Sequence, residues 1–259
     1  MGSNVAILQL YLLPAGPLFS CLTALWLISL AIRNASIIDI FWGLGFGIVA
    51  VGTRLQVPGG WHADVLTAMA LLWGIRLAGY LAVRNLGHGE DKRYMAIRAR
   101  NQPFWWKSFF IVFLFQGFLT LIVGLPLVLG QQPRDAAFGV LDGLGLALFL
   151  TGWLWESVAD AQLWLFKRDP ASRGQVMTRG LWSLSRHPNY FGEIVLWWGI
   201  GLFAAGAPGA LPGLLGPALI QFLLMRVSGV PLLEAGMAAR PGYAAYVART
   251  GALMPRFWK

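Results

Sequence analysis

Long apolar runs separated by short polar loops dominate the 259 residues of this chain. A helix of about 20 apolar residues crosses the hydrocarbon core of a bilayer, so each run of that length predicts a transmembrane helix. Seven runs qualify, at approximately 5–32, 37–55, 62–83, 104–130, 138–166, 190–206 and 209–229. The pattern therefore predicts an all-α integral membrane protein whose residues 1–259 form a single domain of seven transmembrane helices.

The first run contains Pro14, Gly16 and Pro17, which predict a helix that is kinked or begins late. No basic residue precedes this run, and it continues to Ile32, beyond the apolar core of a cleaved signal peptide. We therefore expect it to remain in the protein as a transmembrane helix.

Composition supports the membrane assignment. Hydrophobic residues make up 57% of the chain and charged residues 12%, against about 25% charged residues in a typical soluble domain. The mean hydropathy is +0.62. Cys21 is the only cysteine, which excludes an intrachain disulfide. His62, His88 and His187 are far apart in the sequence, so we expect no metal site.

Basic residues are distributed asymmetrically among the predicted loops. Seventeen of the twenty lie in the first, third and fifth loops and in the C-terminal tail, whereas Arg54 and Arg134 lie in the even-numbered loops and Arg76 within a span. Because basic residues accumulate on the cytoplasmic side of membrane proteins, this asymmetry predicts an N-terminus outside and a C-terminus in the cytoplasm.

The net charge of +9 is concentrated on this inner face, where membrane lipid with anionic headgroups is the expected partner. Nucleic acid is not expected as a partner, because the basic residues are divided among short loops between spans. Nothing in the sequence indicates an obligate protein partner.

Glycines recur at short intervals within the predicted helices. Gly43, Gly45 and Gly47 have a spacing like that of a nucleotide-binding loop, but no strand precedes them, so close helix packing is the better interpretation. Gly139 and Gly143 have the four-residue spacing of small residues at helix contacts.

Charged side chains inside apolar spans are costly, so they usually pair with one another around a cavity. Glu156 and Asp160 are four residues apart and share one helix face, as do Arg76 and Tyr80. Arg76 is the expected counter-charge for the two acids. These residues form either a ligand site or a network that only stabilises the helix bundle.

Asp39 lies at the start of the second predicted helix, before Phe41-Trp42-Gly43. One interpretation is a favourable interaction with the helix dipole. The other is a carboxyl group kept protonated by its apolar surroundings, which donates a hydrogen bond to a substrate carbonyl.

The segment Ser185–Glu193 has the densest polar chemistry in the chain, directly before an apolar run. Its guanidinium, imidazole, amide, phenol and carboxylate belong to Arg186, His187, Asn189, Tyr190 and Glu193. Such chemistry beside a membrane span indicates an active or binding site at the membrane interface.

The run Arg186-His187-Pro188-Asn189-Tyr190-x-Gly192-Glu193, with Asp160 upstream and Met254-Pro255 near the C-terminus, resembles the membrane steroid 5α-reductase superfamily, in particular its bacterial members. The resemblance implies seven helices that enclose NADPH and an apolar enone such as a steroid. It implies reduction of a conjugated carbon–carbon double bond beside a ketone. It also implies a multi-pass protein of the bacterial inner membrane.

Matching positions imply the site residues. Asp39 corresponds to the acid that meets the substrate carbonyl, and Trp73 stands where the family has the tyrosine that polarises the ketone. The expected cofactor-binding residues are Arg76, Tyr80, Arg84, Arg93, Tyr94, Glu156, Asp160, Lys167, Arg173, Arg186, His187, Asn189, Tyr190 and Glu193. Among these, we expect Arg84, Arg93, Arg173 and Arg186 to lie near the cofactor phosphates.

The chain departs from the family at several positions. Glu156 replaces an asparagine, and a C-terminal histidine–tyrosine pair has no clear counterpart among residues 234–240. Isoprenylcysteine and phospholipid methyltransferases, which use S-adenosylmethionine, look similar at Arg-His-Pro-x-Tyr-x-Gly and are the main alternative. A lipid carrier or transporter is a further alternative, although the sequence has no repeated halves.

Overall fold

The computed structural model describes residues 2–58, 60–134 and 137–257. It is 75% helical, and the described ranges contain no β-strand. The chain divides into two compact units. Unit 1 comprises residues 1–139 and 204–216, and unit 2 comprises residues 140–203 and 217–259. The all-α prediction is confirmed, and the single domain over the whole chain stays a prediction.

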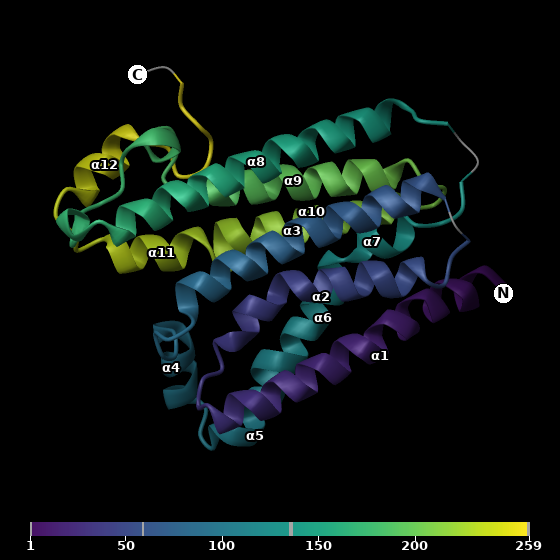
Figure 1. Ribbon diagram of the computed structural model, residues 1–259, viewed down its shortest axis with the longest axis horizontal. Coiled ribbons are helices and arrows are strands. Elements are labelled where there is room, and N and C mark those ends of the chain that lie inside the picture. Colours follow the sequence, from purple (N-terminus) through teal and green to yellow (C-terminus); the bar gives the residue numbers. More distant parts are fainter. Residues whose placement is uncertain (1, 59, 135–136, 258–259) are drawn as a thin grey trace. The chain divides into compact units, whose positions relative to one another are not determined.

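Unit 1 is built on three long helices: α1 (Gly2–Ala31), α2 (Ile37–Arg54) and α3 (Trp61–Asn85) (Figure 1). Helix α2 packs against both α1 and α3. The shorter helices of unit 1 are α4 (Lys92–Arg100), α5 (Phe104–Ser108), α6 (Phe115–Val123) and α7 (Leu125–Leu129). A π-helical turn, Phe109–Leu114, makes α5 and α6 continuous.

Unit 2 contains α8 (Val140–Arg168) and most of α9 (Pro188–Ala205), joined by a loop with two 3₁₀ turns, Pro170–Ser172 and Gly180–Ser183. Helix α10 (Leu215–Phe222) begins in unit 1 and continues in unit 2. A π-helical turn, Leu223–Val227, leads to α11 (Val230–Met237) and then to α12 (Tyr243–Arg249).

Within the described residues, five helical segments are long and apolar enough to cross a membrane. They are Leu12–Ala31, Ile37–Arg54, Trp61–Asn85, Phe104–Val123 and Leu211–Met237. Helices α8 and α9 form where two further spans are predicted. Seven spans and the orientation of the termini therefore stay predictions, while several membrane-length helices are confirmed. Helix α1 begins at Gly2 and contains Pro14 and Pro17, so a late start is not observed, and the expected kink stays a prediction.

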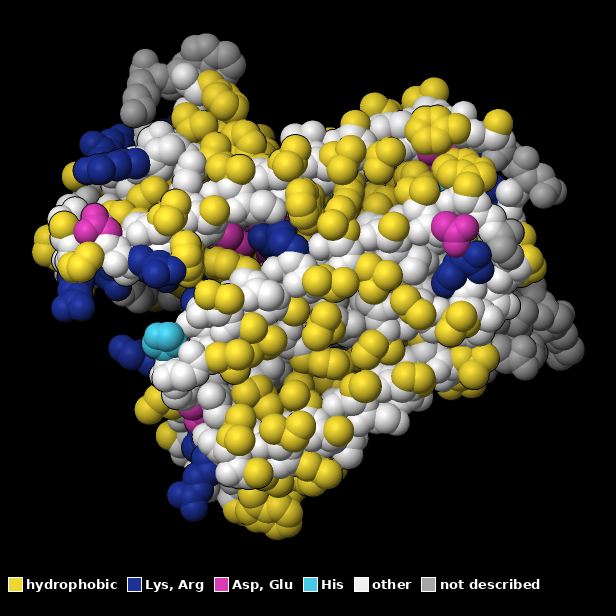
Figure 2. All heavy atoms as spheres, viewed as in Figure 1, with side chains coloured by type: hydrophobic (Ala, Val, Ile, Leu, Met, Phe, Trp, Pro, Cys, Tyr) yellow, Lys and Arg dark blue, Asp and Glu magenta, His cyan; other side chains and the backbone are white. Residues whose placement is uncertain are grey.

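The surface agrees with a lipid environment. Large apolar side chains such as Leu27, Ile28 and Ile75 are more than half exposed. Figure 2 shows apolar side chains over the visible faces of the unit 1 helices, whereas lysine and arginine gather where those helices end. This is the distribution expected where helix faces meet lipid tails and helix ends meet headgroups.

The helices of unit 1 approach one another closely. The core contains Leu18, Ile38 and Phe113, which are fully or almost fully buried. Lipid tails are as apolar as these side chains, so van der Waals packing rather than exclusion from water holds the helices together. A Cβ added at Gly43 of α2 would lie 2.7 Å from the Gly74 carbonyl oxygen of α3. The packing role predicted for Gly43 is therefore confirmed.

Candidate functional site

Asp39, in the first turn of α2, accepts hydrogen bonds from two residues of α4. Arg93 Nη2 donates to Asp39 Oδ2 at 2.8 Å, and the Tyr94 hydroxyl donates to Asp39 Oδ1 at 2.6 Å. Gln116 Nε2 of α6 donates to the Tyr94 oxygen at 3.1 Å. The Asp39 side chain is only 16% exposed. This network ties α4 and α6 to the start of α2.

The role expected of Asp39 stays a prediction. A carboxyl group that donates to a substrate carbonyl must be protonated, yet both Asp39 oxygens act as acceptors and one faces a guanidinium. That ion pair favours the charged carboxylate, whereas burial of the side chain favours the protonated form. Burial, together with the neighbouring Asp39, raises the pKa of Tyr94 well above its ordinary value, so the phenol keeps its proton. Tyr94 is therefore the hydrogen-bond donor of this pair.

Arg76, Tyr80 and Arg84 recur at four-residue intervals on α3 and share one face of that helix. The Arg84 guanidinium lies over the Tyr80 ring at 5.6 Å from its centroid. Trp73 is fully buried, and its ring meets the Phe46 ring edge-on at 5.5 Å. Trp73 thus belongs to the packed interior of unit 1, and its predicted contact with a ketone stays a prediction.

In unit 2, glycines bring the backbones of α8 and α9 into contact. A Cβ added at Gly192 of α9 would lie 2.6 Å from Glu156 N and 2.7 Å from Gly152 O of α8. Two turns further along α9, a Cβ at Gly199 would lie 2.7 Å from Gly145 O. Because the glycines repeat every seven residues on both helices, the close contact extends along their length. It fixes Glu156 against the first turns of α9.

A buried acid–amide cluster, formed by Glu156, Asp160, Asn189 and Glu193, lies along this contact. Its three acids are 2%, 4% and 8% exposed. Asn189 Nδ2 donates to Asp160 Oδ1 at 3.3 Å, while Asn189 Oδ1 is buried without a hydrogen-bond partner among the described residues. Nδ1 of His187, two residues earlier, is likewise buried without a hydrogen-bond partner among the described residues. An unsatisfied buried polar atom costs about 1–3 kcal/mol, so these atoms indicate a site for a polar ligand.

Arg186 makes contacts within unit 2 that its sequence neighbours do not indicate. Its Nε and Nη2 donate to Glu234 Oε1 of α11 at 2.8 and 2.7 Å, and its Nη1 donates to the Thr250 carbonyl at 2.5 Å. The Arg186 side chain is only 11% exposed. These contacts fasten α11 and the end of α12 to the start of α9, and the expected contact of Arg186 with a cofactor phosphate stays a prediction.

The segment before α9 also pairs with the chain after α12. Arg186 N donates to the Gly251 carbonyl at 2.9 Å. His187 N donates to the Ala252 carbonyl at 3.1 Å. The Tyr246 hydroxyl of α12 donates to backbone carbonyls of the same segment. Hydrogen bonds to backbone groups therefore hold the Arg-His-Pro-Asn segment in place against the C-terminal chain.

His187 is held between Glu234 and Tyr190. Its Nε2 lies 3.1 Å from Glu234 Oε1, and its ring stacks on the Tyr190 ring at 5.6 Å. Burial lowers the pKa of His187 below its ordinary value, against the opposing effect of Glu234 and with some help from Arg186. The unfolded chain therefore binds the proton more readily, so His187 makes the protein less stable as pH falls through about 6.5, the unfolded value.

We expect the melting temperature in detergent to be lower at pH 5.5 than at pH 7.5, and His187→Gln to reduce that difference. One group of this kind changes stability by at most about 1.4 kcal/mol per pH unit, or about 3–6 °C. His88→Gln, at an exposed histidine, is the matched control and should behave as the parent. An unchanged pH difference in His187→Gln would contradict the assignment.

The four arginines expected near the cofactor phosphates have different surroundings. They are Arg84, Arg93, Arg173 and Arg186. Arg93 and Arg186 are used in ion pairs with Asp39 and Glu234. Arg173 is exposed, as is Lys167 near the end of α8, so both are accessible to an anionic ligand.

Glu234 is the residue that the sequence analysis missed. It joins Arg186 and His187 of the most polar segment, but it lies 41 or more residues away in an otherwise apolar helix and belongs to no motif. The sequence did contain one indication of its importance, the same as for Glu156: a carboxylate within an apolar helix needs a partner. Gln116, the partner of Tyr94, gave no such signal.

Apolar helices of bilayer length are consistent with an integral membrane protein, and the buried acid–amide cluster is its candidate ligand site. The chain belongs to the family described as "Protein of unknown function (DUF1295)", whose match covers residues 25–250. That family is related to the steroid 5-alpha-reductase-like and methyltransferase-like membrane enzymes. The expected resemblance is thus confirmed at the level of the superfamily.

Two curated relatives are fungal. An uncharacterized protein of Schizosaccharomyces pombe is 27% identical over 226 residues, which cover 72% of this chain and 62% of the relative. A probable O-methyltransferase of Ustilaginoidea virens is 30% identical over 101 residues, covering 38% of this chain and 34% of the relative. The chain therefore spans less than two thirds of the length of both. No solved structure matches it.

Proposed function

We propose that this protein is a membrane reductase that uses NADPH to reduce a conjugated carbon–carbon double bond beside a ketone, in a 3-oxo-4-ene steroid or a similar apolar lipid. The observation that carries the proposal is the acid–amide cluster of unit 2, with the buried and unsatisfied Asn189 Oδ1 at its edge. The cofactor supplies hydride, and the protein supplies binding, orientation and exclusion of water.

The residues of the cluster fit a nicotinamide. A carboxamide carries both donors and an acceptor, and it complements an asparagine oxygen beside carboxylates. The buried acids Glu156, Asp160 and Glu193 also favour the positive charge that the oxidised nicotinamide ring carries. Exposed Lys167 and Arg173 provide positive charge for the phosphates.

The substrate ketone requires a hydrogen-bond donor, because negative charge develops on its oxygen during reduction. The resemblance assigns this donor to Asp39, whose carboxyl group must be protonated to fill the role.

The direct test is NADPH oxidation by the detergent-purified protein, with and without progesterone, with the product mass measured. Steroid-dependent oxidation and a gain of two hydrogens support the reductase. Binding of NADPH without turnover retains the cofactor and rejects the steroid as substrate. Absence of both binding and turnover rejects the reductase.

Asn189→Ala is expected to weaken NADPH binding about tenfold, which corresponds to the loss of roughly one hydrogen bond to a buried ligand. The measurement is the dissociation constant from nicotinamide fluorescence. Asn101→Ala, which removes an asparagine bonded only to its own helix turn at Ile97, is the control and should bind as the parent does. Equal affinities in the two variants would show that Asn189 does not contact the cofactor.

One observation favours a second function. The relative from Ustilaginoidea virens is named a probable O-methyltransferase, and the buried acids of the cluster suit the sulfonium and ammonium charges of S-adenosylmethionine as well as an oxidised nicotinamide. Under this alternative, S-adenosylhomocysteine binds tightly and NADPH does not. The two dissociation constants, measured on the same preparation, separate the functions.

A further inference from the structure

A groove of about 490 Å³ lies in unit 1, and its lining includes residues of α4 other than Arg93 and Tyr94. Its lining residues come from the end of α1, from the segment before α4, and from α4 and the turn that follows. They are Arg33, Glu90, Met95, Arg98, Ala99 and Gln102. None of them has a role in the proposed reaction.

The acid in the groove is already neutralised. Arg98 Nε and Nη2 each donate to a Glu90 oxygen at 2.8 Å, and Ala35 N donates to Glu90 Oε1 at 2.7 Å. Burial opposes the charge on Glu90, but these hydrogen bonds hold its pKa below the ordinary value. The Arg98 guanidinium also lies over the Phe104 ring at 4.4 Å from its centroid, so its position is fixed.

Arg33 supplies the remaining positive charge. It is exposed and follows the last turn of α1, where its backbone adopts a left-handed conformation with φ of 53°. Glycine is the residue that normally occupies this position at a helix end, because other side chains are strained there. With Glu90 paired to Arg98, the lining of the groove carries a net positive charge from Arg33.

The groove lies at the ends of candidate membrane spans. One span ends at Ala31, two residues before Arg33, and another begins at Phe104, two residues after Gln102. Trp105 and Trp106 at that second end are 61% and 41% exposed, which is typical of side chains at the headgroup level of a bilayer.

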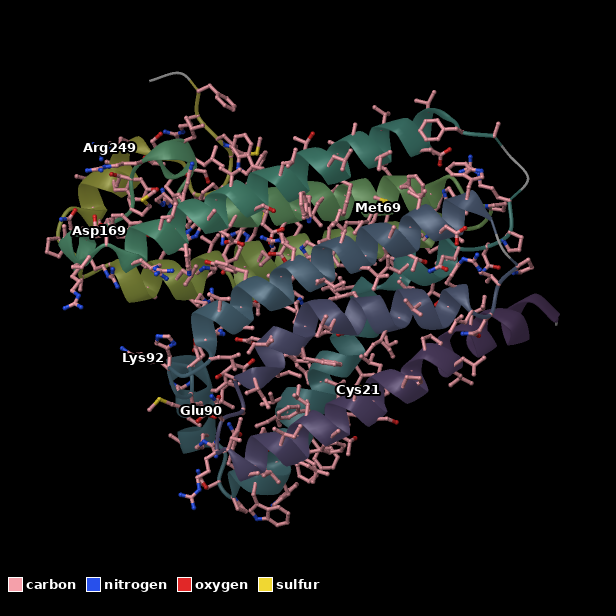
Figure 3. The ribbon with its side chains drawn as sticks, viewed as in Figure 1. Cys21, Met69, Glu90, Lys92, Asp169 and Arg249 are labelled. Atoms are coloured by element: carbon pink, nitrogen blue, oxygen red, sulfur yellow. The ribbon has the colours of Figure 1, made fainter. Side chains whose placement is uncertain are left out.

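The chain segment around the groove is also positively charged. Between Glu90 and Lys107 the chain carries five basic and two acidic residues. In Figure 3 Lys92, at the start of α4, projects away from the bundle, whereas Glu90 lies beside it at the edge of unit 1. The exposed side chain of Met95, 54% exposed, adds an apolar wall to the groove.

We infer that this groove binds the phosphate of an anionic phospholipid headgroup. Arg33 forms paired hydrogen bonds with the phosphate oxygens, and Arg98, whose Nε and Nη2 bind Glu90, contributes through Nη1. Met95 and Ala99 lie against the adjoining glycerol and first acyl carbons. A lipid is favoured over a soluble phosphate because the groove has an apolar wall and opens between two span ends flanked by exposed tryptophans. The inference is independent of the reaction that the protein catalyses.

The test is titration of short-chain lipids into the full-length protein in neutral detergent, followed by microscale thermophoresis. The probes are dioctanoyl phosphatidylglycerol, dioctanoyl phosphatidylcholine and soluble glycerol 1-phosphate. We expect phosphatidylglycerol to bind at least tenfold more tightly than the other two. Arg33→Gln should weaken it about tenfold. Arg249→Gln, at an exposed arginine of α12 outside the groove, is the matched control and should bind as the parent does.

Ala99→Glu is the second variant, because it places a carboxylate in the groove at an exposed helix position and leaves Arg33 in place. It should weaken phosphatidylglycerol binding at least as much as Arg33→Gln, with a melting temperature close to that of the parent. Equal binding of glycerol 1-phosphate and phosphatidylglycerol would overturn the lipid assignment. Undiminished phosphatidylglycerol binding in both groove variants would overturn the site.

Discussion

Gly192→Val is expected to destabilise the protein by about 3 kcal/mol or more, because a valine there has no space. Its Cβ alone would lie 2.6 Å from Glu156 N and 2.7 Å from Gly152 O, and both are backbone atoms that cannot rotate away. Helices α8 and α9 must then separate along the whole glycine contact. A loss of this size lowers the melting temperature of a chain of this length by about 6–12 °C.

The matched control for this substitution is Gly79→Val in α3. Gly79 has no heavy atom within 4 Å of an added Cβ, and it also lies inside a long helix. Its replacement should change stability by less than about 1 kcal/mol, since valine is no worse than glycine in a helix. Equal melting temperatures for the two variants would show that the α8–α9 backbones are not in contact. Because Asn189 and Glu193 flank Gly192, its replacement should also weaken binding of the cofactor.

The long helices could be predicted because bilayer thickness imposes one length on every span, and apolar runs of that length are visible in the sequence. The glycine contact of unit 2 was harder to predict. The sequence analysis singled out Gly139 and Gly143, which have a four-residue spacing. The observed contact instead uses glycines seven residues apart: Gly145 and Gly152 on α8, and Gly192 and Gly199 on α9. Which small residues meet depends on the rotation of each helix, and a single sequence does not determine that rotation.

The acid–amide cluster could be predicted in part. Glu156 and Asp160 share a helix face by spacing alone, and Asn189 and Glu193 belong to one motif. The contacts of Asp39 and Arg186 could not be predicted, because their partners Tyr94 and Glu234 are 55 and 48 residues away. A charged residue in a membrane protein must be paired, but its sequence neighbours do not reveal the partner.

Glu234→Ala is expected to destabilise the protein by about 2–3 kcal/mol. Breaking a fully buried ion pair by removing one partner costs about 3–5 kcal/mol, because the other charge stays buried and uncompensated. Here the Arg186 side chain is 11% exposed and that of Glu234 is 27% exposed, so partial access to solvent reduces the cost. The backbone amides of Arg186 and His187, bonded to residues 251 and 252, should exchange hydrogen for deuterium faster in the variant.

Asp64→Ala is the matched control, because it removes the acid of an exposed pair in which Arg54 and Asp64 are 26% and 59% exposed. Exposed pairs contribute about 0–1 kcal/mol, so this variant should melt close to the parent. Glu234→Gln keeps a hydrogen-bond acceptor for Arg186 and should fall between the two alanine variants. If Glu234→Ala instead melts like Asp64→Ala, Arg186 does not depend on Glu234, and its guanidinium is again a candidate for binding a cofactor phosphate. The same melting series therefore decides between the two roles of Arg186.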